Sequence, residues 1–154
     1  MNETMTAVPE HPLAVRLAGL LTPYRPVLSR WQWYQQDERI TTALGFLGGD
    51  SLAIVLDPSQ GRLVLDVWVG NAPCTVEALL ALLAANFNAP WKTRVAEHDA
   101  EQAVVCLEAL LPLEYGLNHL VTLVQEGLAA GLRRRGALSQ LWRKTTEQTA
   151  GISA

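Results

Sequence analysis

The stretch SLAIVLDPSQGRLVLDVWV, residues 51–69, decides the fold. In both of its halves apolar residues recur at every second position, as in β-strands that bury one face. The centre, Asp57 to Gly61, places Pro58 at the second position of a tight turn and Gly61 where a left-handed residue is needed. We therefore predict an antiparallel hairpin. Its buried face comprises Leu52, Ile54, Leu56, Leu63, Leu65, Val67 and Val69.

The opposite face of this hairpin is more apolar than a face in water should be. Its members are Ser51, Val55, Arg62, Val64, Asp66 and Trp68. Because contiguous exposed apolar side chains usually mark contact sites, we expect something to cover this face. Another element of the same chain, a second protomer or a ligand chain would each do so.

Helical patterns lie before and after the hairpin. Leu13, Leu17, Leu20 and Leu21 follow i, i+4, i+7, i+8 spacing, and Pro23 ends that helix. A second helix runs from the N-cap Thr75 to Phe87 and is apolar nearly all round, which predicts burial on more than one side. A third keeps the helical period from Leu117 to Leu132 and is expected to end near Gly136. Gly127 and Gly131 weaken it, or else allow another backbone to approach closely.

Strand patterns fill the remaining segments. Residues 40–47, 91–98 and 102–109 are strand-like, whereas 27–34, with Trp31 and Trp33, fits either a helix or a strand. The predicted order is helix, three strands, helix, two strands, helix. Such an order with short turns predicts an α+β fold with an antiparallel sheet flanked by helices.

The composition limits the class of protein. The 154 residues are 49% hydrophobic and only 18% charged, against about 25% charged in an average domain. We expect one α+β domain over 11–144, with flexible tails at 1–10 and 145–154, and burial beyond one protomer. The net charge of -3 disfavours nucleic acid, and no apolar run is long enough for a membrane span. Residues 1–10 do not resemble a secretory signal, and Cys74 and Cys106 lack disulfide or metal spacing, which predicts a cytoplasmic protein.

The sequence contains few candidates for chemistry. His11, His98 and His119 form no metal-ligand pair, and no nucleophile or phosphate-loop motif occurs. We therefore expect no enzyme activity, no catalytic residue, no cofactor and no metal. The cations at 133–135 follow a long acidic stretch, and they fit a helix terminus, a nucleic-acid patch or pairing with a partner.

Four segments together resemble the class I type III secretion chaperone family of bacterial virulence systems. They are the hairpin 51–69, the middle helix 78–87 with its string Leu83-Ala-Ala-Asn-Phe87, the late strand 103–113 and the long last helix. The YbjN-like family shares most of this pattern. The resemblance implies a homodimer that binds the N-terminal segment of a secreted effector and keeps it competent for secretion without ATP. The YbjN-like alternative is a regulatory or folding-support protein that binds a folded protein partner.

The resemblance also suggests where the two kinds of contact lie. The predicted dimer interface comprises Leu79, Leu82, Leu83, Phe87, Val105 and Leu107. The predicted effector-binding residues are Leu17, Leu21, Val64 and Trp68. For both sets, burial in the core of one chain is the alternative.

Overall fold

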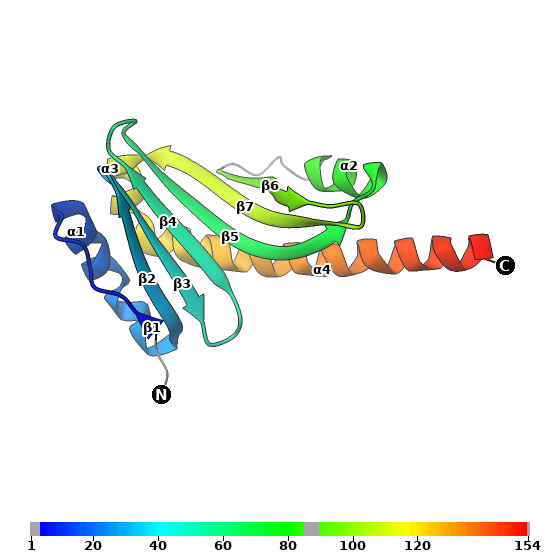
Figure 1. Cartoon of the computed structure of the whole chain (residues 1–154), viewed down its shortest axis with the longest axis horizontal. Helices are drawn as coiled ribbons and strands as arrows, with labels where there is room; N and C mark the ends of the chain where they lie inside the picture. Colours follow the sequence, from blue (N-terminus) through cyan, green and yellow to red (C-terminus); the bar gives the residue numbers. More distant parts are fainter. Residues whose placement is uncertain (1–3, 85–89, 154) are drawn as a thin grey trace.

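The chain forms an α+β fold, as the sequence predicts. The computed structural model describes residues 4–84 and 90–153, with side chains from 6 to 84 and from 90 to 147. Seven strands make one sheet in the order β1-β2-β3-β4-β5-β7-β6, antiparallel except for the short β1, which runs parallel to β2 (Figure 1). The strands are β1 (Thr4–Met5), β2 (Leu28–Gln36), β3 (Arg39–Phe46), β4 (Ser51–Asp57), β5 (Arg62–Pro73), β6 (Trp91–His98) and β7 (Gln102–Pro112).

The helices form at sites marked by local sequence. They are α1 (Pro12–Leu21), the 3-10 helix η1 (Thr22–Val27), α2 (Val76–Ala84), α3 (Leu113–Asn118) and α4 (Leu120–Ser153). Helix α1 begins at Pro12, where the missing N–H is no loss, and His11 Nδ1 accepts a hydrogen bond from Leu13 N at 3.1 Å. At the start of α2, Thr75 Oγ1 accepts from Ala78 N at 3.1 Å, which confirms the predicted cap.

Four strands, β2 to β5, lie between α1 and α2, one more than the predicted three. The additional strand is β2, the segment that the sequence left open between helix and strand. Trp31 and Trp33 alternate with polar residues, so both side chains point to the same buried face of the sheet. Trp31 Nε1 donates a hydrogen bond to Thr42 Oγ1 at 2.8 Å across the β2–β3 pairing.

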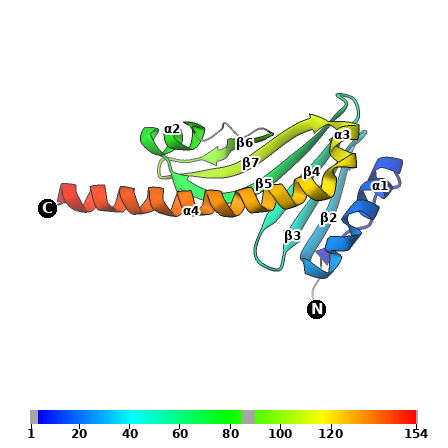
Figure 2. The same cartoon turned by 180° about the vertical axis from the view of Figure 1, so that it is seen from behind.

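The core lies between one face of the sheet and the helices. In Figure 2, α4 crosses in front of the strands, and the opposite face of the sheet, seen in Figure 1, has no helix over its centre. The buried face of the predicted hairpin is confirmed, because its seven apolar side chains all belong to this core. Its register pairs Ile54 with Leu65, and Gly61 turns the chain with φ +62°. The sheet therefore has a covered face and an open face.

Helix α4 is longer than the sequence predicts. It continues through Gly136 to Ser153, because this glycine does not adopt the left-handed conformation that ends helices. The tails predicted at 1–10 and 145–154 thus contain regular structure, namely β1 and the last turns of α4. Beyond the sheet, α4 projects as a single helix (Figure 1).

The two glycines in the middle of α4 allow it to lie close against the covered face. A Cβ on Gly127 would lie 2.5 Å from Cη2 of Trp91, and one on Gly131 would lie 3.0 Å from Cγ1 of Val67. The close neighbours of both glycines are side chains of the sheet, so these positions seat α4 on Trp91 and Val67 of its own chain and do not bring another backbone close.

Strand β5 extends beyond the end of β4, and α4 completes its free edge. The β5–β7 register shifts between Trp68 and Gly70, where Gly70 has φ +151°. At the bulge Arg135 Nε donates to the Val69 carbonyl at 3.1 Å, and just past it Trp142 Nε1 donates to the Asn71 carbonyl at 2.8 Å. Two carbonyls in the part of β5 that extends beyond β4 thus accept hydrogen bonds from side chains of the helix.

Candidate functional site

The open face of the sheet carries an apolar strip over β5 and β7. Val64 pairs in register with Leu110, and Trp68 lies four residues along β5 on the same face. Trp68 is 42% exposed and Leu110 is 49% exposed, while Val64 is half-buried. We call these three residues the apolar strip. The strip is apolar, and no helix lies over the centre of this face, so the cover expected from the same chain is not seen there.

An ion cluster lies beside the strip on the same face. Arg94 of β6 contacts the carboxylates of both Asp66 and Glu108, with 3.1 Å between its Nε and Glu108 Oε2. Asp66 and Glu108 face each other across the β5–β7 pairing. One guanidinium therefore serves two carboxylates, all three partly shielded from water.

Cys106 lies on the open face between Trp68 and Arg94 in the strand register. Burial, helped by the nearby Asp66 carboxylate, raises the pKa of its thiol to about 11. The thiol is therefore protonated at neutral pH, and nucleophilic chemistry would need the thiolate.

A hollow of about 180 Å³ opens next to the ion cluster. Ala43 of β3 and Ala53 of β4 are small side chains paired with each other, so the sheet surface is low between β2 and β5. Arg30 lines the hollow on the β2 side, and Asp66 and Trp68 line it on the β5 side. The hollow is the size of a single side chain and continues into the apolar strip.

Helix α2 presents a second apolar surface at the far end of the sheet. Val76, Leu80 and Leu83 follow i, i+4, i+7 spacing and are all exposed, Leu80 to 60%. We call these residues the α2 stripe. The prediction that this helix is buried on more than one side is wrong for the single chain, because α2 lies at the end of the sheet and only Ala78 and Leu82 are buried.

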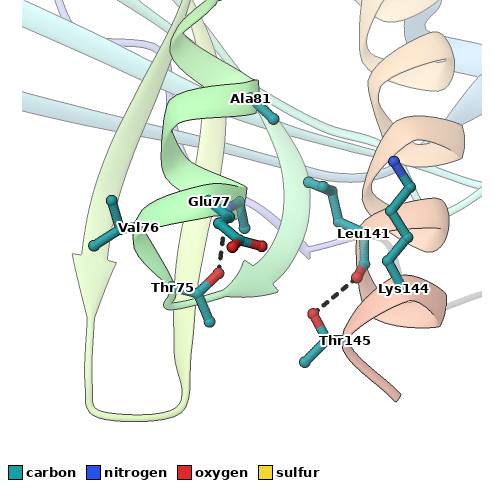
Figure 3. Close-up of a pocket in the computed structure, with 8 residues that line it drawn as sticks. Thr75, Val76, Glu77, Ala81, Leu141, Lys144 and Thr145 are labelled. Atoms are coloured by element: carbon teal, nitrogen blue, oxygen red, sulfur yellow. Dashed lines mark hydrogen bonds between the residues drawn. The ribbon is translucent and has the colours of Figure 1, made fainter. Parts of the chain in front are cut away.

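A groove of about 450 Å³ separates α2 from the projecting part of α4 (Figure 3). Glu77 and Ala81 lie on the α2 side, and Leu141, Lys144 and Thr145 lie on the α4 side. The groove is lined by apolar side chains, by two threonines, and by one acidic and one basic residue. It is continuous with the α2 stripe through Val76, which lines both.

The predicted dimer residues fall into separate environments. Leu83 is exposed on the α2 stripe and Leu79 is half-buried, whereas Leu82, Val105 and Leu107 are buried in the single chain. Phe87 lies outside the described residues. Of the described set, only Leu83 and part of Leu79 offer surface to a partner in this structure.

The predicted effector-binding residues divide in the same way. Val64 and Trp68 lie together in the apolar strip, as expected for a shared contact surface. Leu17 and Leu21 are fully buried between α1 and the sheet, so an effector contact through them is wrong for this structure. The apolar face of α1 meets the core of its own chain, the alternative that the sequence had left open.

Three exposed apolar residues of these surfaces are not among the contact residues predicted from the sequence. Leu110 lies just past the predicted end of the late strand. It is two residues after Glu108, and this spacing would have placed both side chains on the same face of the strand. Val76 and Leu80 share the helical spacing of Leu83, but an all-apolar helix gives no indication of which side remains exposed.

Neither metal ligation nor membrane crossing is supported by the described residues. In ranges 4–84 and 90–153 no three His, Cys, Asp or Glu side chains are grouped to hold a metal ion. No helix in these ranges combines the length and apolarity needed to cross a bilayer.

Comparisons with family models, with curated proteins and with solved structures find no match to this chain.

Proposed function

We propose that this protein holds an extended, unfolded segment of another protein on the open face of its sheet. The observation that carries the proposal is the apolar strip, exposed on a face that no helix covers. More specifically, we propose that the protein acts as a class I type III secretion chaperone, which keeps the N-terminal segment of a secreted effector unfolded in the cytoplasm. This form rests on the resemblance in sequence pattern.

An extended segment suits this face for geometric reasons. Side chains on one side of an extended chain repeat about every 6.6 Å, the same repeat as Val64 and Asp66 along β5. A segment lying along the strands can therefore place alternate side chains on the strip. Fully burying a large apolar side chain contributes about 1.5–3 kcal/mol, and each residue of the strip can contribute only part of that, because Val64 is half-buried and Trp68 and Leu110 are less than half exposed. Binding of this strength is reversible and does not require ATP.

The second part of the proposal is a homodimer formed through the α2 stripe. A two-fold axis brings the same patch of both copies together, and an apolar stripe is complementary to itself. The neighbouring groove holds Glu77 and Lys144, which offer opposite charges to the second copy. Leu83 of the predicted dimer set belongs to this stripe, and Leu80 and Val76 extend it.

Binding is tested with a defined cargo fragment. The chain is co-expressed with the N-terminal fragment of the secreted protein encoded by the neighbouring open reading frame, and the two are co-purified. We expect Trp68→Asp to lower the recovered fragment at least about tenfold, since it places a charge in an apolar contact. The matched control is Leu47→Asp, which alters an exposed side chain in the β3–β4 turn.

Two outcomes would contradict the binding proposal. One is a complex that Trp68→Asp weakens no more than Leu47→Asp does. The other is a partner that stays fully folded in the complex, measured by its near-UV circular dichroism, which would favour the YbjN-like alternative.

The dimer is tested by light scattering during size exclusion. We expect a mass of about twice 16.8 kDa for the unchanged chain and of about 16.8 kDa for Leu80→Glu. Leu47→Glu introduces the same charge at an exposed leucine elsewhere and should remain dimeric. A monomeric unchanged chain at micromolar concentration would refute self-association through this stripe.

A further inference from the structure

The α2 stripe alone is too small to hold two copies together. Its three residues, Val76, Leu80 and Leu83, are between 54% and 74% exposed. At about 25 cal/mol per Å², the 1.5–3 kcal/mol gained by burying such a side chain corresponds to about 60–120 Å² of apolar surface. The stripe therefore offers roughly 100–250 Å² per copy, whereas a stable interface buries about 800 Å² per partner. A dimer through this stripe must also use a neighbouring surface.

The groove between α2 and α4 is the surface next to the stripe, and Val76 belongs to both. Figure 3 shows α2 and α4 side by side, with Ala81 and Leu141 on opposite sides of the space between them. At about 450 Å³ the groove is larger than one side chain, and it extends along α2 from Thr75 to Ala81. It therefore fits the face of a second helix better than a single residue.

The positions around α2 show that most of its stripe is turned away from its own groove. Successive residues of a helix are about 100° apart, so Glu77 and Ala81 lie on one flank of α2, and these two residues line the groove. Leu80 and Leu83 do not line it. A second copy can bring the same stripe into the groove from outside.

The part of α4 that lies beside the groove is only partly covered by the described residues of its own chain. There α4 projects beyond the sheet as a single helix (Figures 1 and 2). Leu141 is half-buried, and Trp142 is 37% exposed. Because most helical stability in proteins comes from packing an apolar face, a helix in the groove would stabilise this part of α4.

The groove also contains two charges of opposite sign that are not joined to each other. Glu77 lies on its α2 side and Lys144 on its α4 side. Neither forms a salt bridge within the ranges whose side chains are described, 6–84 and 90–147. Each can therefore pair with an opposite charge that a second copy brings.

We propose that α2 of a second copy lies in this groove, with its stripe against Leu141 and the aliphatic stem of Lys144. A two-fold axis running along the helices makes the contact reciprocal, since it places α2 of each copy between α2 and α4 of the other. An axis across the helices would set groove against groove and leave both empty. This inference rests on the proposed dimer, and it adds the projecting part of α4 to the interface.

The same axis brings the charges of the two copies together. An axis along the helices keeps equal residues of both copies at the same level, so Glu77 of each copy lies beside Lys144 of the other. Two equivalent ion pairs then form across the interface, and their exchange provides a test.

The first experiment blocks the groove without changing the stripe. Ala81→Glu adds a longer, charged side chain to the α2 side of the groove. We expect the dissociation constant of the dimer, from light scattering over a dilution series, to rise at least about tenfold, because a carboxylate then opposes an apolar stripe. The matched control is Ala129→Glu at an exposed alanine earlier in α4, which should leave the dissociation constant within about twofold.

The second experiment exchanges the charges. Glu77→Lys and Lys144→Glu each place like charges at both reciprocal contacts, so each variant alone should dimerise about tenfold more weakly. An equimolar mixture of the two should recover the dissociation constant of the unchanged chain to within about threefold, because every lysine then meets a glutamate of the other copy. An altered fold within one chain cannot give this recovery.

The results separate this inference from the dimer on which it rests. If Ala81→Glu dimerises as well as Ala129→Glu while Leu80→Glu is monomeric, the groove is not part of the interface and the stripe dimer stands. Charge variants that dimerise normally, or a mixture that shows no recovery, also overturn the reciprocal contact. A monomeric unchanged chain refutes the dimer itself.

Discussion

Replacing Gly127 by alanine tests how closely α4 packs on the sheet. The added Cβ would lie 2.5 and 2.7 Å from Cη2 and Cζ2 of Trp91, and 3.2 Å from Cγ2 of Val67. Carbon atoms prefer about 3.5–4.0 Å, so the ring or the helix must move by about 1 Å. Trp91 is buried, so its ring cannot simply move aside into solvent. Overpacking of this kind lowers the free energy of unfolding by about 1–3 kcal/mol.

The same helix provides a matched control. Gly136 lies two to three turns further along α4, and a Cβ there meets no atom within 4 Å. Both substitutions gain about 1 kcal/mol of helix propensity, so their difference isolates the cost of packing against Trp91. We expect Gly136→Ala to stabilise the chain and Gly127→Ala to fall about 1–3 kcal/mol below it. At about 2–4 °C per kcal/mol for a chain of this length, the melting temperatures should differ measurably.

Urea unfolding followed by far-UV circular dichroism measures both free energies. A double-mutant cycle with Trp91→Phe should reduce the penalty of Gly127→Ala, because phenylalanine lacks the outer ring atoms that collide. If Gly127→Ala proves as stable as Gly136→Ala, the close approach of α4 to β6 is wrong.

Three further outcomes follow from the structure. A hydrogen bond from Ser59 Oγ at 2.7 Å, chiefly, holds the pKa of Asp57 below its usual value. This contribution to the stability of the folded state is complete at pH values above the unfolded pKa near 3.8 and is lost as the pH falls through the lower pKa of the folded state. Ser59→Ala should therefore raise the pKa of Asp57 in an NMR titration. An unchanged pKa would exclude this hydrogen bond as the cause. Iodoacetamide at neutral pH should modify Cys74 before Cys106, whose pKa is raised to about 11, as mass spectrometry of partly labelled protein would show; equal rates would contradict the buried thiol. Trp142→Phe removes a hydrogen bond to the β5 edge and should lower the free energy of unfolding by about 1 kcal/mol in urea titration, whereas an unchanged value would mean that water replaces it equally well.

The parts of the fold that follow from local pattern could be predicted. The turn at Pro58 and Gly61 and the alternation on either side determine the β4–β5 hairpin, because strand register depends on which residues are buried. The cap at Thr75 is equally local. The segment around Trp31 is ambiguous from the sequence, because Val27, Leu28, Trp31 and Tyr34 fit the helical period while Trp31 and Trp33 fit the strand period.

The sequence could not show which apolar helix faces pack against the core of the same chain and which remain exposed. Leu17 and Leu80 both lie on apolar helix faces, yet one is fully buried and the other is 60% exposed. The difference comes from where the sheet ends, a property of tertiary arrangement that no residue of either helix encodes. The hollow at Asp66 was hidden for the same reason, because it joins residues of strands far apart in the sequence.

The completion of the β5 edge by α4 has a consequence for biosynthesis. The carbonyls of Val69 and Asn71 receive their donors from residues 66 and 71 positions later in the chain. During synthesis this half of β5 is made well before the helix that covers it, so its edge stays open to other strands until α4 has emerged from the ribosome. A pause in translation between these segments would prolong that exposure and favour aggregation of the nascent chain. Arg135 and Trp142 therefore protect the protein after synthesis but not during it.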